Sequence, residues 1–353
     1  LLDASLALST PDKSAVRQTA EAIRSGLDPI GDALLASREQ SERRLLGQVF
    51  TPESILRPMV EWILDQSPTR IVDAGCGSGR FILAIARMSK ASLVGLDTDP
   101  LSTLATRAGL AVLGNTAALV VNGDYRNASL LTHDGKTAFV GNPPYVRHHG
   151  LAAESKAWAQ AAAARVGVPI SGLAGLHAHF FLATALHARR GDVGCFVTSS
   201  EWLDVNYGEV IRRLLLDGLG GRSIHVFKPN AFPFGSAATT AAVTCFEVGS
   251  QPASLRIRMV SNAKELSPLT AGRPISRERL SAARRWLPLI RSKPTVPEGY
   301  VELGEICRVH RGAVTGSNAT WIVPFGEGAH PIPERYQFPS VTRARELIRA
   351  GES

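Results

Sequence analysis

The sequence is poor in cysteine and has no long apolar run. These two absences argue against a disulfide-rich protein and against a membrane protein. Its 353 residues include four cysteines, and no two of them form a CxxC pair. This spacing excludes a zinc ribbon or a thioredoxin-like site and argues against a disulfide scaffold. No apolar stretch approaches membrane-spanning length, and residues 1–10 are too short and too acidic for a secretion signal. We therefore expect a protein of the reducing cytoplasm, without a membrane segment.

An initiator methionine and internal repeats are also missing. We expect the natural start to lie upstream of Leu1. The length predicts roughly two domains at about 150 residues each. Hydrophobic residues make up 44% of the chain and charged residues 20%, as in ordinary globular proteins. A chain of this size can bury a full core without disulfide or metal staples.

Basic residues outnumber acidic ones, which gives a net charge of +8. The excess is concentrated between residues 254 and 298, where ten bases and three acids leave a net +7. One interpretation of these basic residues is an ordinary solvent-exposed surface. Clustering favours nucleic acid as a partner. The adjacent pair Arg284 and Arg285 is a candidate DNA contact within this cluster.

Short apolar runs alternate with helical patterns between residues 70 and 248, which predicts an α/β fold. The expected strands are Arg70–Ala74, Ser92–Leu96, Ala118–Asn122, Thr137–Gly141, Val193–Thr198, Ile224–Phe227 and Ala241–Val248. The expected helices are Phe81–Ser89, Leu101–Leu113, an amphipathic Leu176–Arg189 and Val210–Leu216. The continuously apolar strands indicate a sheet buried on both faces. We expect a Rossmann-like, doubly wound, mostly parallel sheet of seven strands.

The chain is expected to have three parts. Residues 1–46 form an N-terminal helical segment, whose pattern begins at residue 13 and is interrupted by Gly-Leu-Asp-Pro at 26–29. Residues 47–250 form the α/β domain. After residue 250 the sequence becomes basic and Pro-rich, so residues 251–353 are expected to form a separate region.

A glycine-rich loop, Asp73-Ala-Gly75-Cys-Gly77-Ser-Gly79, lies between an expected strand and helix. Position 80 is Arg, so the loop is not the G-x-G-x-x-G fingerprint of dinucleotide-binding proteins. Asp97 ends the next strand, where a carboxylate can accept both hydroxyls of a ribose. Asp124 ends the third strand and suits an adenine amino group, with Tyr125 beside it to cover the ring. Successive parallel strands end at one edge of a sheet, so the pattern predicts an adenosine-type cofactor.

The tetrapeptide Asn142-Pro143-Pro144-Tyr145 closes the fourth expected strand. Asn-Pro-Pro is most often a turn, but beside a cofactor it can do chemistry. The amino nitrogen of a nucleobase is a poor nucleophile, because its lone pair is delocalised into the ring. The side-chain oxygen of Asn142 and the carbonyl of Pro143 could accept its two N–H groups and draw the lone pair out of conjugation. Proline holds these acceptors still, and Tyr145 offers a face to stack on the base and steady the growing positive charge.

Five segments in this order resemble those of amino-methyltransferases that use S-adenosylmethionine. They are Gln48-Val-Phe50-Thr51-Pro52, DAGCGSG, LVGLD, NGDY and NPPY. With the FTP segment ahead of the glycine loop, the order is similar to the gamma class of DNA N6-adenine methyltransferases, as in type II restriction–modification systems. The resemblance covers roughly residues 40–250 and implies that residues 47–250 are a methyltransferase domain acting on adenine N6 in duplex DNA.

The resemblance also implies roles for individual residues. The cofactor-binding set is Phe50 and Thr51 near the methionine end, Asp73, Gly75 and Gly77 around the methionine, Asp97 at the ribose, and Asp124 and Tyr125 at the adenine. The catalytic set is Asn142, Pro143, Pro144 and Tyr145, with a later aromatic packing on the other side of the flipped base. For this last role we favour Phe234 over Phe232.

An enzyme of this class must extrude its target base from the duplex. Arg147, His148 and His149 follow the tetrapeptide and are candidate DNA contacts, although they could equally be ordinary loop residues. No metal site is expected, because His177 and His179 lie on different faces of a helix and no carboxylate or Cys accompanies them at ligand spacing.

Residues 303–318 look like the entrance to a target-recognition region, and the chain ends too soon after them to complete one. Recognition is then expected from a missing C-terminal region or a separate specificity subunit, in the cytoplasm of a bacterium or phage. Two other functions stay open. One is an NPPY methyltransferase acting on RNA or a protein glutamine; the other is a non-catalytic DNA-binding subunit.

Overall fold

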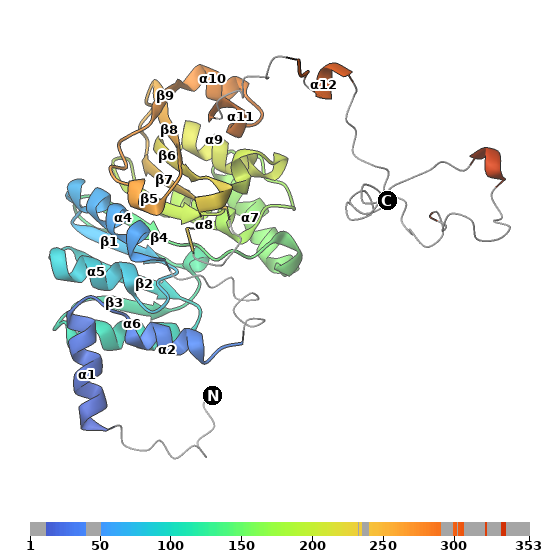
Figure 1. Ribbon diagram of the computed structural model, residues 1–353. Helices are drawn as coiled ribbons and strands as arrows, with labels where there is room; N and C mark the ends of the chain where they lie inside the picture. Colours follow the sequence, from blue (N-terminus) through green and yellow to red (C-terminus); the bar gives the residue numbers. More distant parts are fainter. Residues whose placement is uncertain are drawn as a thin grey trace. The chain divides into compact units, whose positions relative to one another are not determined.

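The computed structural model describes residues 12–39, 51–231, 233–234 and 240–290, together with residues 299–301, 303–306, 322 and 333–336. Residues 1–292 form one compact unit and residues 293–353 a second one. Within the second unit, the described elements are helix α12 (Leu303–Ile306) and a 3-10 turn at Glu334–Tyr336. The first unit contains the sheet and the helices that cover it (Figure 1).

The described part of the first unit is built on a nine-stranded sheet with the order β3-β2-β1-β4-β5-β7-β6-β8-β9. The strands are β1 (Arg70–Ala74), β2 (Ser92–Asp97), β3 (Leu119–Asn122), β4 (Thr137–Gly141), β5 (Val193–Thr198), β6 (Gly221–Phe227), β7 (Ala242–Glu247), β8 (Ser254–Val260) and β9 (Arg273–Ser276). All neighbours pair in parallel except around β7 and at the edge strand β9. The expected mostly parallel α/β sheet is confirmed, with nine strands rather than seven.

The two extra strands correct the expected domain boundary at residue 250. Strand β8 pairs in parallel with β6, and β9 pairs with β8, so this basic segment extends the sheet. Strand β8 lacks the continuous apolar run of the central strands because it lies near the sheet edge, where buried Leu255 and Ile257 alternate with Arg256 and Arg258. The compact unit instead ends at residue 292.

Helices cover both faces of the sheet, because side chains of each central strand point alternately to opposite faces. On one face they pack against α4 (Glu53–Asp65), α5 (Arg80–Met88) and α6 (Pro100–Val112). On the other they pack against α7 (Ala153–Arg165), α8 (Leu176–His187), α9 (Glu209–Asp217) and α10 (Arg277–Ala282), with the short α11 (Leu287–Ile290) at its border. Strand β4 contributes to both cores: Phe139 packs on one face, and its neighbours Ala138 and Val140 pack on the other. The result is a three-layer α/β/α unit (Figure 1).

Helix α8 differs from the expected amphipathic helix. Its eight consecutive residues from His177 to Thr184 are all buried. The helix packs on the sheet between α7 and α9, so it has little solvent-facing surface. The first turns of α8 lie beside the carboxyl edge of the sheet, where Leu176 and Phe180 share a pocket with the loop after β1.

Among the described residues, the N-terminal part of the chain contains two helices, α1 (Lys13–Arg24) and α2 (Pro29–Ala36). Both helices pack against α6. Asp12 and Asp28 accept backbone N–H groups at the two helix starts, and the break at residues 26–29 lies between the helices. Residues 40–46, expected to be helical, lie outside the described residues.

Candidate functional site

The sheet reverses its winding direction between β1 and β4, and the loops after these strands meet at its carboxyl edge. Such a switch point is the usual ligand position in open α/β sheets. At Gly141 a Cβ atom would lie 2.5 Å from the carbonyl oxygen of Ala74. The end of β4 therefore lies directly against the end of β1, which brings the tetrapeptide beside the glycine loop.

The glycine loop forms one wall of a first pocket at this edge. The φ angles of Gly75, Gly77 and Gly79 are +74°, +55° and +95°, a region that residues with side chains rarely adopt. The N–H groups of Gly75 and Cys76 both donate to the carbonyl of Leu96, at 2.9 and 2.8 Å. The loop thus folds back over β2 and presents its backbone to the pocket.

Asp97 lies in the same pocket and holds the glycine loop in place. Its carboxylate accepts the N–H of Gly77 at 2.8 Å and the N–H of Asp99 at 2.9 Å. Burial raises the pKa of Asp97, and these two N–H groups partly offset that rise. The predicted ribose acceptor is therefore also a structural support for the loop.

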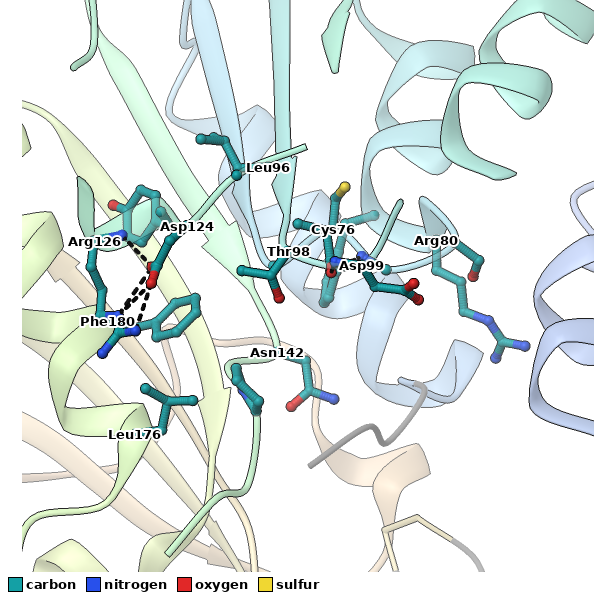
Figure 2. Close-up of a pocket in the computed structure, with 18 of the residues that line it drawn as sticks. Cys76, Arg80, Leu96, Thr98, Asp99, Asp124, Arg126, Asn142, Leu176 and Phe180 are labelled. Carbon is teal, nitrogen blue, oxygen red and sulfur yellow. Dashed lines mark hydrogen bonds and ion pairs between the residues drawn. The ribbon is translucent and has the colours of Figure 1, made fainter. Parts of the chain in front are cut away.

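Asp124 and an arginine that sequence reasoning missed stand at the other end of the pocket. Arg126 forms an ion pair with Asp124 at 2.5 Å and also donates from its backbone N–H at 2.9 Å. Burial tends to raise the pKa of Asp124, but the Arg126 bonds bring it below its usual value. Figure 2 shows Asp124, Arg126 and Phe180 at one side of the pocket, facing Thr98 and Asp99 across it.

Tyr125 lines the pocket, but its ring belongs mainly to the core. It is 2% exposed, and its hydroxyl lies 2.9 Å from the hydroxyl of Thr184. Phe180 packs on it with ring centroids 5.5 Å apart, and a Cβ at Gly75 would lie 3.5 Å from the Phe180 ring. Phe180 of α8 therefore spans the space between the glycine loop and Tyr125. The only sequence signal for it was the helix that follows the tetrapeptide.

The methionine-end residues are described in part. Thr51 is buried and lines the first pocket, whereas Phe50 lies outside the described residues. Arg80, also in the pocket wall, pairs with Asp28 at 2.8 Å and with Asp32 at 2.7 Å. These long-range pairs tie the N-terminal helices to the pocket, and nothing in the local sequence indicates them.

Asp73 does not line the pocket, although the resemblance placed it beside the methionine. It is 1% exposed and belongs to strand β1, ahead of the glycine loop. Burial raises the pKa of Asp73 to about 8, against a smaller lowering effect from the Ile82 N–H at the start of α5. A direct contact between Asp73 and a ligand is thus not visible in the pocket wall.

The raised pKa gives a pH-dependent stability prediction. An acid whose pKa is higher in the folded state stabilises the fold below its unfolded pKa, near 4, and this stability is lost as pH rises towards 8. Asp73→Asn mimics the protonated form, so its stability relative to the wild type should rise by about 1.4 kcal/mol per pH unit across this window. Denaturant unfolding at pH 6 and pH 8 measures the difference, with Asp65→Asn at an exposed position as the control. An equal difference at both pH values would contradict the prediction.

The tetrapeptide separates two pockets. Asn142 and Pro144 line the first pocket with the glycine loop, and Tyr145 lines a second pocket. Pro143 is buried between them. The ring of Phe234 meets the ring of Tyr145 edge-on, with centroids 5.8 Å apart and an interplanar angle of 78°. Burial raises the pKa of the Tyr145 hydroxyl, so the ring stays neutral.

Arg147, His148 and His149 line the second pocket beyond Tyr145. The Arg147 side chain is 81% exposed and lies 3.5 Å from Glu201, and the two histidine rings lie 3.7 Å apart. The expected cluster after the tetrapeptide is thus assembled at the mouth of a pocket.

The basic region between residues 254 and 290 is only partly available for a partner. Four of its arginines donate to backbone carbonyls or pair with an acid: Arg256, Arg258, Arg273 and Arg277. Arg284 and Arg285 are exposed. The next residue, Trp286, is buried. Its backbone N–H donates to the Leu203 carbonyl at 2.7 Å, and its ring packs against Trp202. Because Trp286 contacts Trp202 and Leu203, Arg284 and Arg285 lie close to the segment that contains Glu201 of the second pocket.

Two further features bear on the site. Within the described ranges, no three His, Cys, Asp or Glu side chains gather closely enough to hold a metal ion. No helix in the part of the chain that the structure describes has the length and hydropathy needed to cross a membrane.

Comparisons with known proteins agree with this fold. Residues 27–219 match the model of the N-6 DNA methylase family. The type II methyltransferase M.XamI of Xanthomonas campestris pv. amaranthicola is 50% identical over 308 residues, which cover 86% of this chain and 58% of that protein. The chain thus spans little more than half the length of this relative. The chain belongs to the N-6 DNA methylase family.

Solved structures show the same fold. A putative class I S-adenosylmethionine-dependent methyltransferase from Listeria monocytogenes has a TM-score of 0.54 at 15% identity, covering 70% of this chain and 75% of that one. The type IIG restriction endonuclease BpuSI has a TM-score of 0.55 at 18% identity, covering 73% of this chain and 34% of its own. At these identities the two solved structures show a shared fold, and the expected family of N6-directed DNA methyltransferases is confirmed by the family match over residues 27–219.

Proposed function

We propose that the chain transfers a methyl group from S-adenosylmethionine to the N6 amino group of an adenine flipped out of duplex DNA. The observation that carries the proposal is the position of residues 142–145. Asn142 shares the first pocket with the glycine loop, and Tyr145 opens on the second pocket. Cofactor and target base would then meet across one short segment of chain.

The residues of the first pocket suit S-adenosylmethionine. Gly75 and Gly77 line the pocket without side chains, so a ligand can approach the loop backbone closely. Asp97 offers a carboxylate for ribose hydroxyls, and Asp124 offers one for an adenine amino group. Apolar walls are supplied by Phe180 and Leu176. When bound, the cofactor supplies an electrophilic methyl group on its sulfonium.

The tetrapeptide would prepare the amino nitrogen. The Asn142 side-chain oxygen and the Pro143 carbonyl accept its two N–H bonds, which concentrates the lone pair on nitrogen. Tyr145 and Phe234 provide aromatic surface for the base. The methylated nitrogen carries a positive charge and releases one proton to water, so no general base is required.

Arg284 and Arg285 would hold DNA phosphates near the second pocket. Replacing both by alanine should weaken DNA binding about equally for all sequences. It should also lower the slope of log affinity against log salt by about 2, since each phosphate contact contributes about 0.9. Fluorescence anisotropy at several salt concentrations measures both effects. Lys90→Ala, which removes an exposed charge beside the amino end of β2, is the control. An unchanged salt slope would reject the assignment.

The proposal as a whole is tested by sequencing methylated bases in DNA from cells that express the full-length gene. N6-methyladenine at one sequence context, lost in an Asn142→Ala strain, is the expected result. Incubating the protein with labelled cofactor and DNA, RNA or protein separates the other acceptors. Label found only in RNA or protein would overturn the proposal.

A further inference from the structure

The second pocket lies directly behind the first, and two short segments separate them. Along residues 142–145, Asn142 faces the first pocket and Tyr145 the second. Along residues 175–177, Leu176 lines the first pocket while Gly175 and His177 line the second. A hydrogen bond of 2.9 Å from the Leu176 N–H to the Val146 carbonyl joins the two segments. A base held at the tetrapeptide would therefore project into the space that His177 faces.

His177, like the Tyr145 hydroxyl, is a buried polar group of this pocket without a hydrogen-bond partner among the described residues. It is 7% exposed, and no hydrogen bond or ion pair to its ring occurs in the described part of the chain. Polar side chains that are buried this deeply normally have a partner. An imidazole aimed into a pocket without one is a group prepared for a ligand.

The position of the ring is set by its surroundings. A Cβ at Gly175 would lie 3.1 Å from Cε1 and 3.2 Å from Nδ1 of His177, so glycine is needed to let the ring pack against the chain. Burial lowers the pKa of His177 to about 4. The ring is therefore neutral near pH 7, with one N–H donor and one nitrogen acceptor.

Three other polar groups of the pocket, Tyr207, Glu201 and Arg147, contact one another. The Tyr207 hydroxyl donates to Glu201 at 3.1 Å, and Arg147 lies 3.5 Å from the same carboxylate. A carboxylate can only accept hydrogen bonds, whereas the ring nitrogens of adenine are themselves acceptors. Glu201 cannot serve them, and the N–H of His177 can.

We propose that His177 donates a hydrogen bond to a ring nitrogen of the target adenine, N1 or N7, and thereby orients the base for the tetrapeptide. The inference rests on the proposed function. These two nitrogens flank the C6 amino group of adenine. Cytosine has a nitrogen on only one side of its amino group, so a donor on the other side would also help to select a purine. His177 is thus a specificity-determining residue outside the tetrapeptide.

The test combines His177 variants with altered bases at the methylated position, using the full-length protein and a duplex that contains its mapped site. His177→Phe keeps a flat ring without the N–H and should lower kcat/KM for DNA about 10- to 100-fold, the effect of one lost hydrogen bond to a buried group. The Kd for the cofactor should stay within about twofold of wild type. His177→Gln retains an N–H donor and should recover part of the loss. His133→Phe is the control: this residue lies in the loop before β4, where its ring is 3.0 Å from the Thr69 hydroxyl, and it lines neither pocket.

The decisive comparison uses 1-deazaadenine and 7-deazaadenine in place of the target adenine. For the analogue that lacks the partner nitrogen, wild type and His177→Phe should have nearly equal kcat/KM, while the other analogue keeps the full difference. The same penalty on adenine and on both analogues would overturn the inference, as would full activity of His177→Phe on adenine. If His177→Phe does not fold, equal wild-type rates on adenine and both analogues would also overturn it. Failure of the wild type to methylate any DNA would overturn the proposed function, and this inference with it.

Discussion

Asn142→Ala is expected to reduce methyl transfer about 10³-fold or more while leaving cofactor binding nearly intact. The side-chain oxygen of Asn142 would accept a bond that strengthens as charge develops on the amino nitrogen, so its loss falls mainly on the transition state. Asn142 contributes one part of a pocket wall that the glycine loop and Asp97 largely build. Single-turnover rates with labelled cofactor, together with a cofactor Kd from calorimetry, measure the two effects separately.

Two variants sharpen this experiment. Asn142→Asp keeps an acceptor oxygen at the same position and should retain more activity than Asn142→Ala. Asn127→Ala removes an exposed amide that lines neither pocket, and it should behave as wild type. If Asn142→Ala lost cofactor affinity and turnover in equal proportion, Asn142 would be a binding residue and the assigned role would fail.

Asp97→Ala should chiefly weaken cofactor binding. Its carboxylate faces the first pocket and also accepts the N–H groups of Gly77 and Asp99. Losing a charge-assisted bond costs about 1–3 kcal/mol, or about 10- to 100-fold in Kd, and the loosened loop adds to this. Calorimetric titration of the cofactor gives the change in Kd.

The structural part of the Asp97 effect can be separated from the ligand contact. Asp97→Asn keeps an acceptor oxygen for the Gly77 N–H, so it should preserve the loop better than Asp97→Ala. Asp65→Ala, at an exposed helix end, controls for the loss of one acidic charge. A cofactor Kd that does not change in Asp97→Ala would reject the ribose assignment.

The central strands and the site could be predicted because they are local signals. Three strands have the limits expected from their short, mostly apolar runs: Arg70–Ala74, Thr137–Gly141 and Val193–Thr198. Their order at the carboxyl edge then brought the glycine loop and the tetrapeptide together. Residues that follow the strands of a parallel sheet lie together at its carboxyl edge, so a functional site built there can be predicted from the sequence.

What could not be predicted depends on tertiary contacts. Strands β8 and β9 lie near the sheet edge and carry arginines that bond to carbonyls, so their pattern resembled a basic surface. Phe180 reaches the pocket only because α8 is enclosed on nearly all sides, and a helical pattern does not show which side chain will lie beside a loop 100 residues earlier. His177 could be judged from sequence only as a metal ligand, because its burial and its missing partner are properties of the folded chain.

Ion pairs connect the N-terminal segment to the first pocket, so a catalytic fragment has to include that segment. Arg38 pairs with Asp99 at 2.7 Å, with side chains 8% and 12% exposed, while Asp28 and Asp32 hold Arg80. A truncated protein that starts at the FTP segment would lack Asp28, Asp32 and Arg38. Arg80 and Asp99 of the pocket wall would then lose these ion-pair partners. Fragments intended for ligand soaking or for fusion to other DNA-targeting modules should therefore retain both helices, since these ion pairs hold Arg80 and Asp99 of the pocket wall.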